Sequence, residues 1–576
     1  MSNPMPSECT VAVNLPRVDE KPIRIGRREM IGELLFAVSI SNILFLRVWV
    51  ELLTFTPANT FFMGQPPQKA HYWAAVIGVS VLSLSLSFMT VIARRGRSKI
   101  LARAVTTTQM GLVLLALNQL RLASSTMIPS LYPFLRQPVL GKIGWAGVLF
   151  AGAAAASMVI GAFYVLRNRA VSIVKLGVLV LWPLAPIVVG QATWRAIHAP
   201  ALIPEQRSKT DLAERVQGST RAATRMVWVL FDEWDYRLTF EEKPRDLVLP
   251  HLNEIAAEAM VARNSFPPGP DTIVSIPSLL TGLVITDLSA RNSCEAEVAV
   301  QGTNGRQELE KMDSIFSDLK SRKKTVATVG WYLPYCRLWG HAMDYCVWRE
   351  TDSERVMRAD GVGQSTSDAF RNMVETGVLS PWGISLGAER ASRTFNELMS
   401  TSLAVVGDSR YDLVFLHLPV PHAPFYYDRH TGGYRRGNNY TSGYFDHLAL
   451  LDESLGRIKA VLRESGNWDR TALLISSDLG YRYSRAFDGK RDSRVPFLLR
   501  VPGITTGRVV IQEPFSTVVT RRLVADLLEG RVRTEESIRR LLFARANNEP
   551  TFSAELPAPT NYHLANRTSK AVYTTK

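Results

Sequence analysis

Acidic and imidazole side chains follow three short apolar runs of the kind that form buried strands. They are Asp232 and Glu233 after MVWVLF, His417 and His422 in and after DLVFLH, and Asp478 shortly after TALLIS. Ligands of an open α/β sheet bind beyond the carboxyl ends of its strands, so we expect these side chains to meet at one edge. Carboxylates and imidazoles that converge there are typical of a metal site, whereas each aspartate alone is also typical of a turn or a helix cap.

Hydroxyl side chains stand after a loop that is rich in proline and glycine. In FPPGPDTIVSIPSLLTG, Thr272, Ser275 and Ser278 lie where a helix is expected to begin. Backbone N–H groups and the helix dipole favour anions at a helix N-terminus, so a hydroxyl there can attack a bound phosphoryl or sulfuryl group. For Ser275 or Ser278 alone, capping of the helix is the competing interpretation.

Basic residues follow the last of these strands. Lys490, Arg491 and Arg494 either clamp anionic oxygens or lie in a solvated loop. We predict substrate contacts from Lys490 and Arg494, together with Ser275. A divalent cation held by the carboxylates would lower the pKa of a threonine hydroxyl and neutralise phosphate oxygens. An imidazole would then protonate the departing alkoxide near neutral pH.

The elements that must position these residues form an α/β pattern. Strand-like runs recur at 226–231, 325–330, 412–417, 471–476 and 495–501, and helical periodicity separates them near 249–262, 308–322, 386–403, 443–465 and 516–529. Strands that alternate with helices predict a mainly parallel sheet that is covered on both faces. We assign this domain to 226–545 and a polar tail to 546–576.

Long apolar stretches are concentrated before residue 195. Five of them are long enough to cross a bilayer, near 30–54, 71–93, 104–120, 143–166 and 176–195. Lys and Arg collect before the first, between the second and third, and between the fourth and fifth, which places these connections in the cytoplasm. We therefore predict a cytoplasmic N-terminus over 1–29, about five transmembrane helices over 30–195, a linker over 196–225 and an extracytoplasmic domain.

Charge and cysteine content limit the possible partners. Much of the formal net charge of +15 falls in the predicted cytoplasmic segments, so the basic composition does not require a nucleic-acid partner. Cys336 and Cys346 share one predicted extracytoplasmic stretch, and they form either a disulfide or two buried thiols.

Four segments resemble the alkaline-phosphatase-like superfamily, in its sulfatase and membrane phosphotransferase branches. VWVLFDE resembles the first strand with its metal-binding acid, and DTIVSIPSLLTG resembles the nucleophile segment. SIFSDLKSRKKTVATVGWY is similar to the helix and strand that follow. FLHLPVPHAPF through LLISSDLGYR is similar to the histidine and second acid segments. The resemblance covers about 226–505, and it implies an alkaline-phosphatase-like sandwich.

Membrane helices before an extracytoplasmic domain are similar to lipoteichoic acid synthases and lipid A phosphoethanolamine transferases. Those proteins move a phospho-alcohol from a phospholipid to an envelope acceptor through a covalent phosphothreonine. The resemblance implies roles for these residues: nucleophile Thr272, metal ligands Asp232, Glu233 and Asp478, and His422, with His417, at the substrate or leaving group. It also implies a divalent ion (Mg, Mn, Ca or Zn), a phospholipid donor, a glycan or glycolipid acceptor and the periplasmic side of a bacterial inner membrane.

Two positions depart from the family pattern. Leu279 stands where sulfatases of the aldehyde-forming type carry an arginine, which disfavours that type. Leu479 stands where the family has a His or Asn that binds metal. The site is then oxygen-rich and mononuclear, which favours Mg, Mn or Ca over Zn, or it takes a ligand from His417, His430 or His447, or it binds no metal. The alternative functions are a sulfatase or phosphatase, and an envelope binding or assembly protein.

Overall fold

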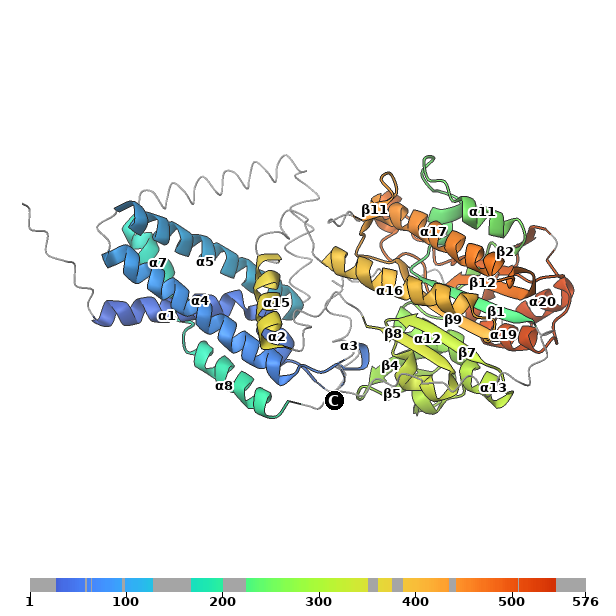
Figure 1. The fold of residues 1–576 in the computed structure, drawn as a ribbon, viewed down its shortest axis with the longest axis horizontal. Helices are drawn as coiled ribbons and strands as arrows, with labels where there is room; N and C mark the ends of the chain where they lie inside the picture. Colours follow the sequence, from blue (N-terminus) through green and yellow to red (C-terminus); the bar gives the residue numbers. More distant parts are fainter. Residues whose placement is uncertain are drawn as a thin grey trace, which may run out of the picture.

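The structure is a computed structural model. It describes residues 27–56, 58, 60–63, 65–95, 99–127, 167–199, 224–350, 361–375, 387–434, 442–505 and 507–544. Of the described residues, those up to 197 are mainly helical, and an α/β part begins at residue 225 (Figure 1). The predicted fourth span at 143–166, most of the predicted linker and the predicted tail lie outside the described residues.

An eight-stranded sheet forms the centre of the α/β part, in the order β14-β2-β13-β12-β1-β9-β7-β8. Its strands are β1 (Arg225–Asp232), β2 (Met260–Ala262), β7 (Val326–Trp331), β8 (Tyr345–Arg349), β9 (Leu413–Pro421), β12 (Thr471–Ser477), β13 (Phe497–Arg500) and β14 (Val509–Ile511). The strands β12, β1, β9, β7 and β8 are parallel, and β13 is antiparallel to both of its neighbours. The prediction of an α/β domain with a mainly parallel sheet is confirmed.

Helices cover both faces of this sheet (Figure 1). Trp228 of β1 contributes to one core and its neighbour Val229 to the other, because successive side chains of a strand point to opposite faces. The first core is closed by α12 (Thr272–Thr281), α13 (Ile315–Ser321) and α19 (Thr520–Leu528). The second is closed by α11 (Pro250–Ala256), α16 (Gly387–Gly407) and α17 (Ser442–Glu464). Apolar side chains are therefore buried in two layers around the sheet.

Short elements complete the domain, and some differ from the sequence-based expectation. The predicted helix 249–262 ends at Ala256, because Met260–Ala262 pairs with β13 as β2. The predicted helix 308–322 is shortened to α13, because Glu308 ends a strand of a three-stranded sheet and Leu309–Lys311 form a separate 3-10 turn. That sheet consists of β4 (Ile285–Ala290), β5 (Ala296–Val300) and β6 (Arg306–Glu308). Three-residue strands carry too little periodicity to be recognised from sequence.

The N-terminal part contains several helices of differing apolar character. They are α1 (Arg27–Leu44), α2 (Leu46–Leu53), α3 (Thr60–Met63), α4 (Lys69–Arg95), α5 (Lys99–Met127), α7 (Arg167–Leu179) and α8 (Leu184–Ile197). By length and composition, Lys69–Ala93 and Ser172–Ile197 could each cross a membrane, and α1 with α2, bent by 63°, could be a third span. Two or three described spans are compatible with a membrane anchor, whereas the five-span topology stays a prediction.

Polar contacts join these N-terminal helices to one another. Lys175 Nζ lies 2.8 Å from Glu33 Oε1, which links α7 to α1. Gln109 Nε2 donates to Thr90 Oγ1 at 2.9 Å and links α5 to α4. Interhelical polar contacts of this kind are common where helices pack in lipid, because an unpaired polar group is unfavourable there.

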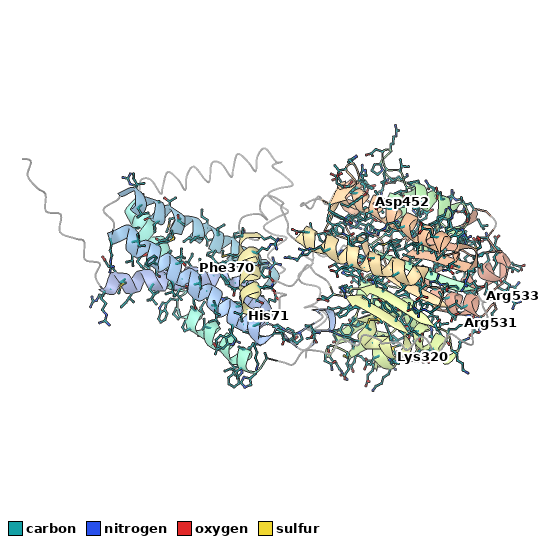
Figure 2. All side chains as sticks on the ribbon, in the orientation of Figure 1. His71, Lys320, Phe370, Asp452, Arg531 and Arg533 are labelled. Carbon is teal, nitrogen blue, oxygen red and sulfur yellow. A yellow bond between two sulfur atoms is a disulfide. The ribbon has the colours of Figure 1, made fainter. Side chains whose placement is uncertain are left out.

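One helix from each part of the chain packs against the other part. The helix α15 (Val362–Val374) follows β8 in the chain but packs on the N-terminal helices, where Phe370 meets Phe45 edge-to-face at 5.3 Å (Figures 1 and 2). In the other direction, Phe61 and Phe62 of α3 are buried in the core of the α/β part. Arg337 Nη1 also donates to the Thr60 carbonyl at 2.7 Å. These contacts fix the α/β part against the helices.

Candidate active site

Parallel pairing brings two aspartates together at the end of the sheet. Phe231 of β1 is in register with Ser477 of β12, so Asp232 and Asp478 leave the sheet side by side. Asp232 is 1% exposed and Asp478 is fully buried. Asp478 Oδ1 accepts the backbone N–H of Glu233 at 3.2 Å, while Asp478 Oδ2 has no hydrogen-bond partner in the described part of the chain. The predicted meeting of Asp232 and Asp478 therefore holds in the structure.

Burial changes the charge state of both aspartates. It raises the pKa of Asp478 to about 7, although hydrogen bonding from the Thr272 hydroxyl opposes the shift. It also raises the pKa of Asp232 well above its usual range, and the charges of Asp478 and Glu233 add to the effect. Like charges in a buried site disfavour ionisation of both groups, so a cation between them would be strongly stabilising.

Thr272 lies against this carboxylate pair. It is the first residue of α12, after Asp271 with an extended backbone (φ −140°), and it is 7% exposed. Its Oγ1 donates to Asp232 Oδ1 at 3.4 Å. The hydroxyl is thus at a helix N-terminus, where the dipole favours a bound anion, and next to a carboxylate that can accept its proton. This is the geometry expected of the predicted nucleophile.

Ser275 lies beside Thr272 but has a different environment. Its hydroxyl is fully buried, donates to the Asp478 carbonyl at 2.6 Å and lies 3.3 Å from the Gly269 carbonyl. The predicted substrate contact does not fit, because the hydroxyl is used to hold α12 to the loop after β12. Nor does Ser275 cap the helix, and Ser278 instead donates to the Val274 carbonyl within it.

The two histidines occupy positions in β9 and directly after it. His417 is fully buried, and its Nδ1 lies 2.9 Å from both the Tyr335 hydroxyl and the Trp331 carbonyl. Burial lowers the pKa of His417 to about 3, so its ring is neutral. Burial also lowers the pKa of His422, while the charge of Glu233 acts in the opposite direction. The Trp331 ring lies against His422 at 5.4 Å. Of the two histidines, His422 is therefore the one whose pKa responds to the charge of Glu233.

A disulfide joins the short helix that begins at Tyr335 to the edge strand β8. Cys336 of α14 (Tyr335–Trp339) is bonded to Cys346 of β8, so the disulfide alternative is confirmed. Burial, followed by the charges of Asp478 and Asp232, raises the pKa of Tyr335 well above its usual value. Tyr335 thus stands between His417 and the aspartate pair as a neutral hydroxyl.

Arg482 is the charged residue that the sequence analysis missed. Its Nε forms an ion pair with Glu233 Oε1, and its Nη1 lies 3.5 Å from Asp271 Oδ1. The side chain is 12% exposed, and that of Glu233 is 1% exposed. The segment DLGYR does place a cation four residues after Asp478, but the sequence contains no signal that pairs it with Glu233.

The predicted anion clamp is directed elsewhere. Lys490 Nζ lies 3.3 Å from Glu242 and is largely exposed. Arg494 pairs with Glu241 at 2.8 Å and with Asp492 at 2.5 Å. The substrate contacts predicted for Lys490 and Arg494 do not fit, because both side chains are directed to carboxylates outside the site and have no described contact with Asp232, Thr272 or Asp478.

Comparisons with known proteins identify the family of the chain. The sequence profile of the Sulfatase family matches residues 225–520, which is half of the chain. The chain belongs to the Sulfatase family. An arylsulfatase of Volvox carteri is 45% identical over 64 residues, and the chain spans about a tenth of the length of this curated relative (10% of each chain). The family includes hydrolases and related enzymes.

The solved structures that match this Sulfatase-family chain share little sequence with it. The PsFucS1 sulfatase of Pseudoalteromonas sp. is 14% identical with a TM-score of 0.38, covering 59% of this chain and 76% of that chain. The phosphonate monoester hydrolase of Agrobacterium radiobacter is 14% identical with a TM-score of 0.34, covering 53% and 74%. An alkaline phosphatase superfamily protein of Vibrio parahaemolyticus is 14% identical with a TM-score of 0.33, covering 55% and 67%.

Sulfatase-like enzymes generally use a divalent metal ion, and part of the predicted donor set fits one. Asp232, the unpartnered Oδ2 of Asp478 and the Thr272 hydroxyl are hard oxygen donors, which suit Mg²⁺ or a similar ion that keeps water ligands. The predicted ligand Glu233 does not fit, because Arg482 already pairs with it. Within the described ranges, no three His, Cys, Asp or Glu side chains are grouped as metal ligands.

The alternative ligands proposed from sequence do not complete the set. His430 is exposed, and Nε2 of His447 accepts the backbone N–H of Tyr426 at 3.0 Å. Leu479 is buried, so an apolar side chain stands directly after Asp478. Two carboxylates and one hydroxyl therefore fit a single hard ion and not a four-coordinate zinc site with nitrogen or sulfur ligands.

Proposed function

We propose that the protein is a membrane-anchored phosphotransferase of the bacterial inner membrane, with its α/β domain on the periplasmic side. It would move a phosphoethanolamine or phosphoglycerol group from a phospholipid to an envelope glycan or glycolipid through a phosphothreonine at Thr272. The observation that carries this proposal is the Thr272 hydroxyl at the start of α12, 3.4 Å from buried Asp232.

In the first half-reaction, the Thr272 oxygen bonds to phosphorus and the bond from phosphorus to the diacylglycerol oxygen breaks. The pair of Asp232 and Asp478 takes the Thr272 proton, and the diacylglycerol oxygen receives a proton from His422. Burial lowers the pKa of His422, so near neutral pH the imidazolium that donates this proton is the minor form, which the charge of Glu233 favours and which is a strong acid once formed. A divalent ion bound by the same oxygen donors would supply positive charge to the phosphoryl oxygens.

In the second half-reaction, an acceptor hydroxyl bonds to phosphorus and the bond from phosphorus to Thr272 breaks. The acceptor proton passes to His422, and the aspartate pair returns its proton to the Thr272 oxygen. All side chains are then in their starting states, so the cycle balances without another reactant. The raised pKa of both aspartates supports their part, because a carboxyl must hold the proton between the two steps.

The contacts between the two parts of the chain support a donor in the membrane. Phe62 of α3 lies 5.1 Å from the ring of Tyr332, and the adjacent Trp331 packs on His422. Tyr332 has φ +66°, a conformation that a non-glycine residue adopts only where its surroundings hold it. The loop between two predicted spans thus contacts the wall of the active site, which would keep the site at a fixed place relative to the bilayer.

A second candidate is a hydrolase, and the family membership favours it. Water would then replace the acceptor hydroxyl in the second half-reaction, with the same nucleophile. A third, non-catalytic role in envelope binding or assembly draws its support from Leu479, whose apolar side chain follows Asp478.

Reconstituted full-length protein can separate these functions. Vesicles of phosphatidylethanolamine and phosphatidylglycerol would be supplied with Mg²⁺, Mn²⁺, Ca²⁺ or Zn²⁺, and released diacylglycerol and free head group would be measured. Diacylglycerol formed by the wild type and by Thr272→Ser, but not by Thr272→Ala, would support the covalent mechanism. Free phospho-head group without acceptor would favour the hydrolase. No release with any of the four metals would contradict both enzyme functions.

A further inference from the structure

Arg482 is a largely buried cation among the acidic residues of the site. Its guanidinium stands between Glu233, with which it is paired, and Asp271, at 3.5 Å. Glu233 directly follows Asp232, and Asp271 directly precedes Thr272. The arginine therefore joins the segment of the first carboxylate to the segment of the nucleophile, and its charge lies beside the place where a substrate anion would react.

The remaining donors of Arg482 are placed to bind an anion. A guanidinium has five N–H donors in a planar fork that matches the oxygens of phosphate or sulfate. Nε and Nη1 contact Glu233 and Asp271, and in the described part of the chain Nη2 has no hydrogen-bond partner. A bidentate contact through Nη1 and Nη2 would leave the ion pair of Nε with Glu233 intact.

More positive charge gathers around this arginine. Arg491 is half-buried, and burial followed by the charges of Arg485 and Arg482 lowers its pKa, while the charges of Asp271 and Glu233 oppose the shift. Cations repel one another when they are brought together in a partly buried place, so the arrangement is more stable when an anion lies among them. Phosphoryl and sulfuryl groups share the required chemistry.

We propose that Arg482 is the fixed cation of this site. It binds an oxygen of the anionic group next to Thr272, and it keeps Glu233 out of the metal ligand set, so that one ion at most is held by Asp232, Asp478 and Thr272. This inference rests on the proposed function for the place of the reacting anion. It does not depend on whether the group is transferred or hydrolysed.

The two roles predict changes of opposite sign in Arg482→Gln. Inorganic phosphate should bind about 10- to 100-fold more weakly, because a charge-assisted bidentate contact is lost. Mn²⁺ should bind about tenfold more tightly, because Glu233 becomes available and a neighbouring positive charge is removed. Both affinities can be measured on the full-length protein in detergent by titration calorimetry, which requires no turnover.

Arg494→Gln is the matched control, because Arg494 also pairs with a glutamate but has no described contact with the site residues. Both affinities should stay at the wild-type values in this variant. Arg482→Lys should keep the Mn²⁺ affinity of the wild type while binding phosphate more weakly, because it retains the charge without the fork. If Arg482→Gln does not fold, Glu233→Gln provides the test: it should still bind one Mn²⁺ per chain and should bind phosphate more tightly.

Several results would overturn the inference. Phosphate affinity that is unchanged in Arg482→Gln would exclude the arginine as the anion site, and weaker Mn²⁺ binding would show that it supports the ligand set. Loss of Mn²⁺ binding in Glu233→Gln would show that Glu233 is a ligand. Failure of the proposed function would look different: Thr272→Ala would retain catalysis while these binding changes remained.

Discussion

Charged side chains at the ends of β1 and β12 differ from those of the nearby loop after β12 in how they are neutralised. In the loop, Lys490 lies 3.3 Å from Glu242 and Arg494 lies 2.8 Å from Glu241, all at or near the surface. At the strand ends, Asp232 and Asp478 are buried together, and neither forms an ion pair among the described residues. Both regions looked like site residues from sequence, but only the second contains buried acids that lack an ion-pair partner among the described residues.

This comparison distinguishes exposed ion pairs, which favour solubility, from buried acids, which favour binding of a cation. An exposed ion pair contributes about 0–1 kcal/mol, whereas an unpaired buried charge costs several kcal/mol. A fold retains such a buried pair only where another group offsets the cost when it binds. The Arg482 pair with Glu233 lies between these cases, because it is buried like the aspartates and paired like the loop.

The largest effect is expected from breaking the buried pair. Asp478→Asn should weaken Mn²⁺ or Mg²⁺ binding by at least about 100-fold, because it removes one of two carboxylate ligands. The metal-free variant should be about 1–3 kcal/mol more stable than the wild type, because one of two buried like charges is gone. Calorimetric titration and thermal unfolding in detergent measure the two quantities. A variant that binds metal like the wild type would contradict the assignment.

The disulfide is expected to have the next largest effect, because it supports the wall beside the buried pair. Replacing Cys336 and Cys346 by serine should destabilise the protein by about 3 kcal/mol, as estimated from closure of a short loop. The exposed Cys294 provides the control, and Cys294→Ser should unfold at the wild-type temperature. Equal unfolding temperatures for the double variant and the wild type would show that Tyr335 is held in place without the disulfide.

The pH dependence sharpens the comparison further. The pKa of Asp478 is raised from 3.8 to about 7 in the folded protein, so folding is favoured while the carboxyl is protonated. In the metal-free protein, this stabilisation is complete below about pH 4 and is lost as pH rises toward 7. The stability advantage of Asp478→Asn over the wild type should therefore grow between pH 4 and 7. Thermal unfolding of both proteins at several pH values measures this difference in stability. A difference that does not change with pH would contradict the raised pKa of Asp478.

The smallest effect is expected in the loop. Lys490→Gln should change the free energy of unfolding by less than about 1 kcal/mol and leave diacylglycerol release within about twofold of the wild type, because its ion pair with Glu242 is exposed. A large loss of activity in this variant, without a change in stability, would show that Lys490 contacts the substrate after all.

Much of the fold could be predicted because its signals are local. The runs that became β1, β9 and β12 are mainly apolar, and the rule that sites lie at strand ends predicted that Asp232 and Asp478 leave the sheet side by side. The start of the helix at Thr272 was predicted because a Pro/Gly-rich loop precedes it. Three-residue β2 was missed, because it pairs with β13 and β14, which are distant in sequence. The sheet of β4, β5 and β6 was also missed, although its strands are neighbours in the chain.

The remaining site features depend on pairing that a single sequence does not encode. Arg482 lies three residues after Leu479, in a segment already noted in the sequence, but its partner Glu233 is 249 residues away. Ser275 looked like a substrate ligand until its hydroxyl was found on the Asp478 carbonyl. The helix α15 could not be placed on the N-terminal helices from its own pattern, because an amphipathic helix does not identify the surface that covers it.

The most direct test of the account is mass spectrometry of the peptide that contains Thr272. Full-length protein would be incubated with phosphatidylethanolamine and phosphatidylglycerol vesicles and a divalent ion, quenched in acid and digested. The account predicts a phosphoethanolamine or phosphoglycerol ester on Thr272, which is absent from Asp478→Asn. An unmodified Thr272 alongside released diacylglycerol, or an adduct on another residue, would contradict it.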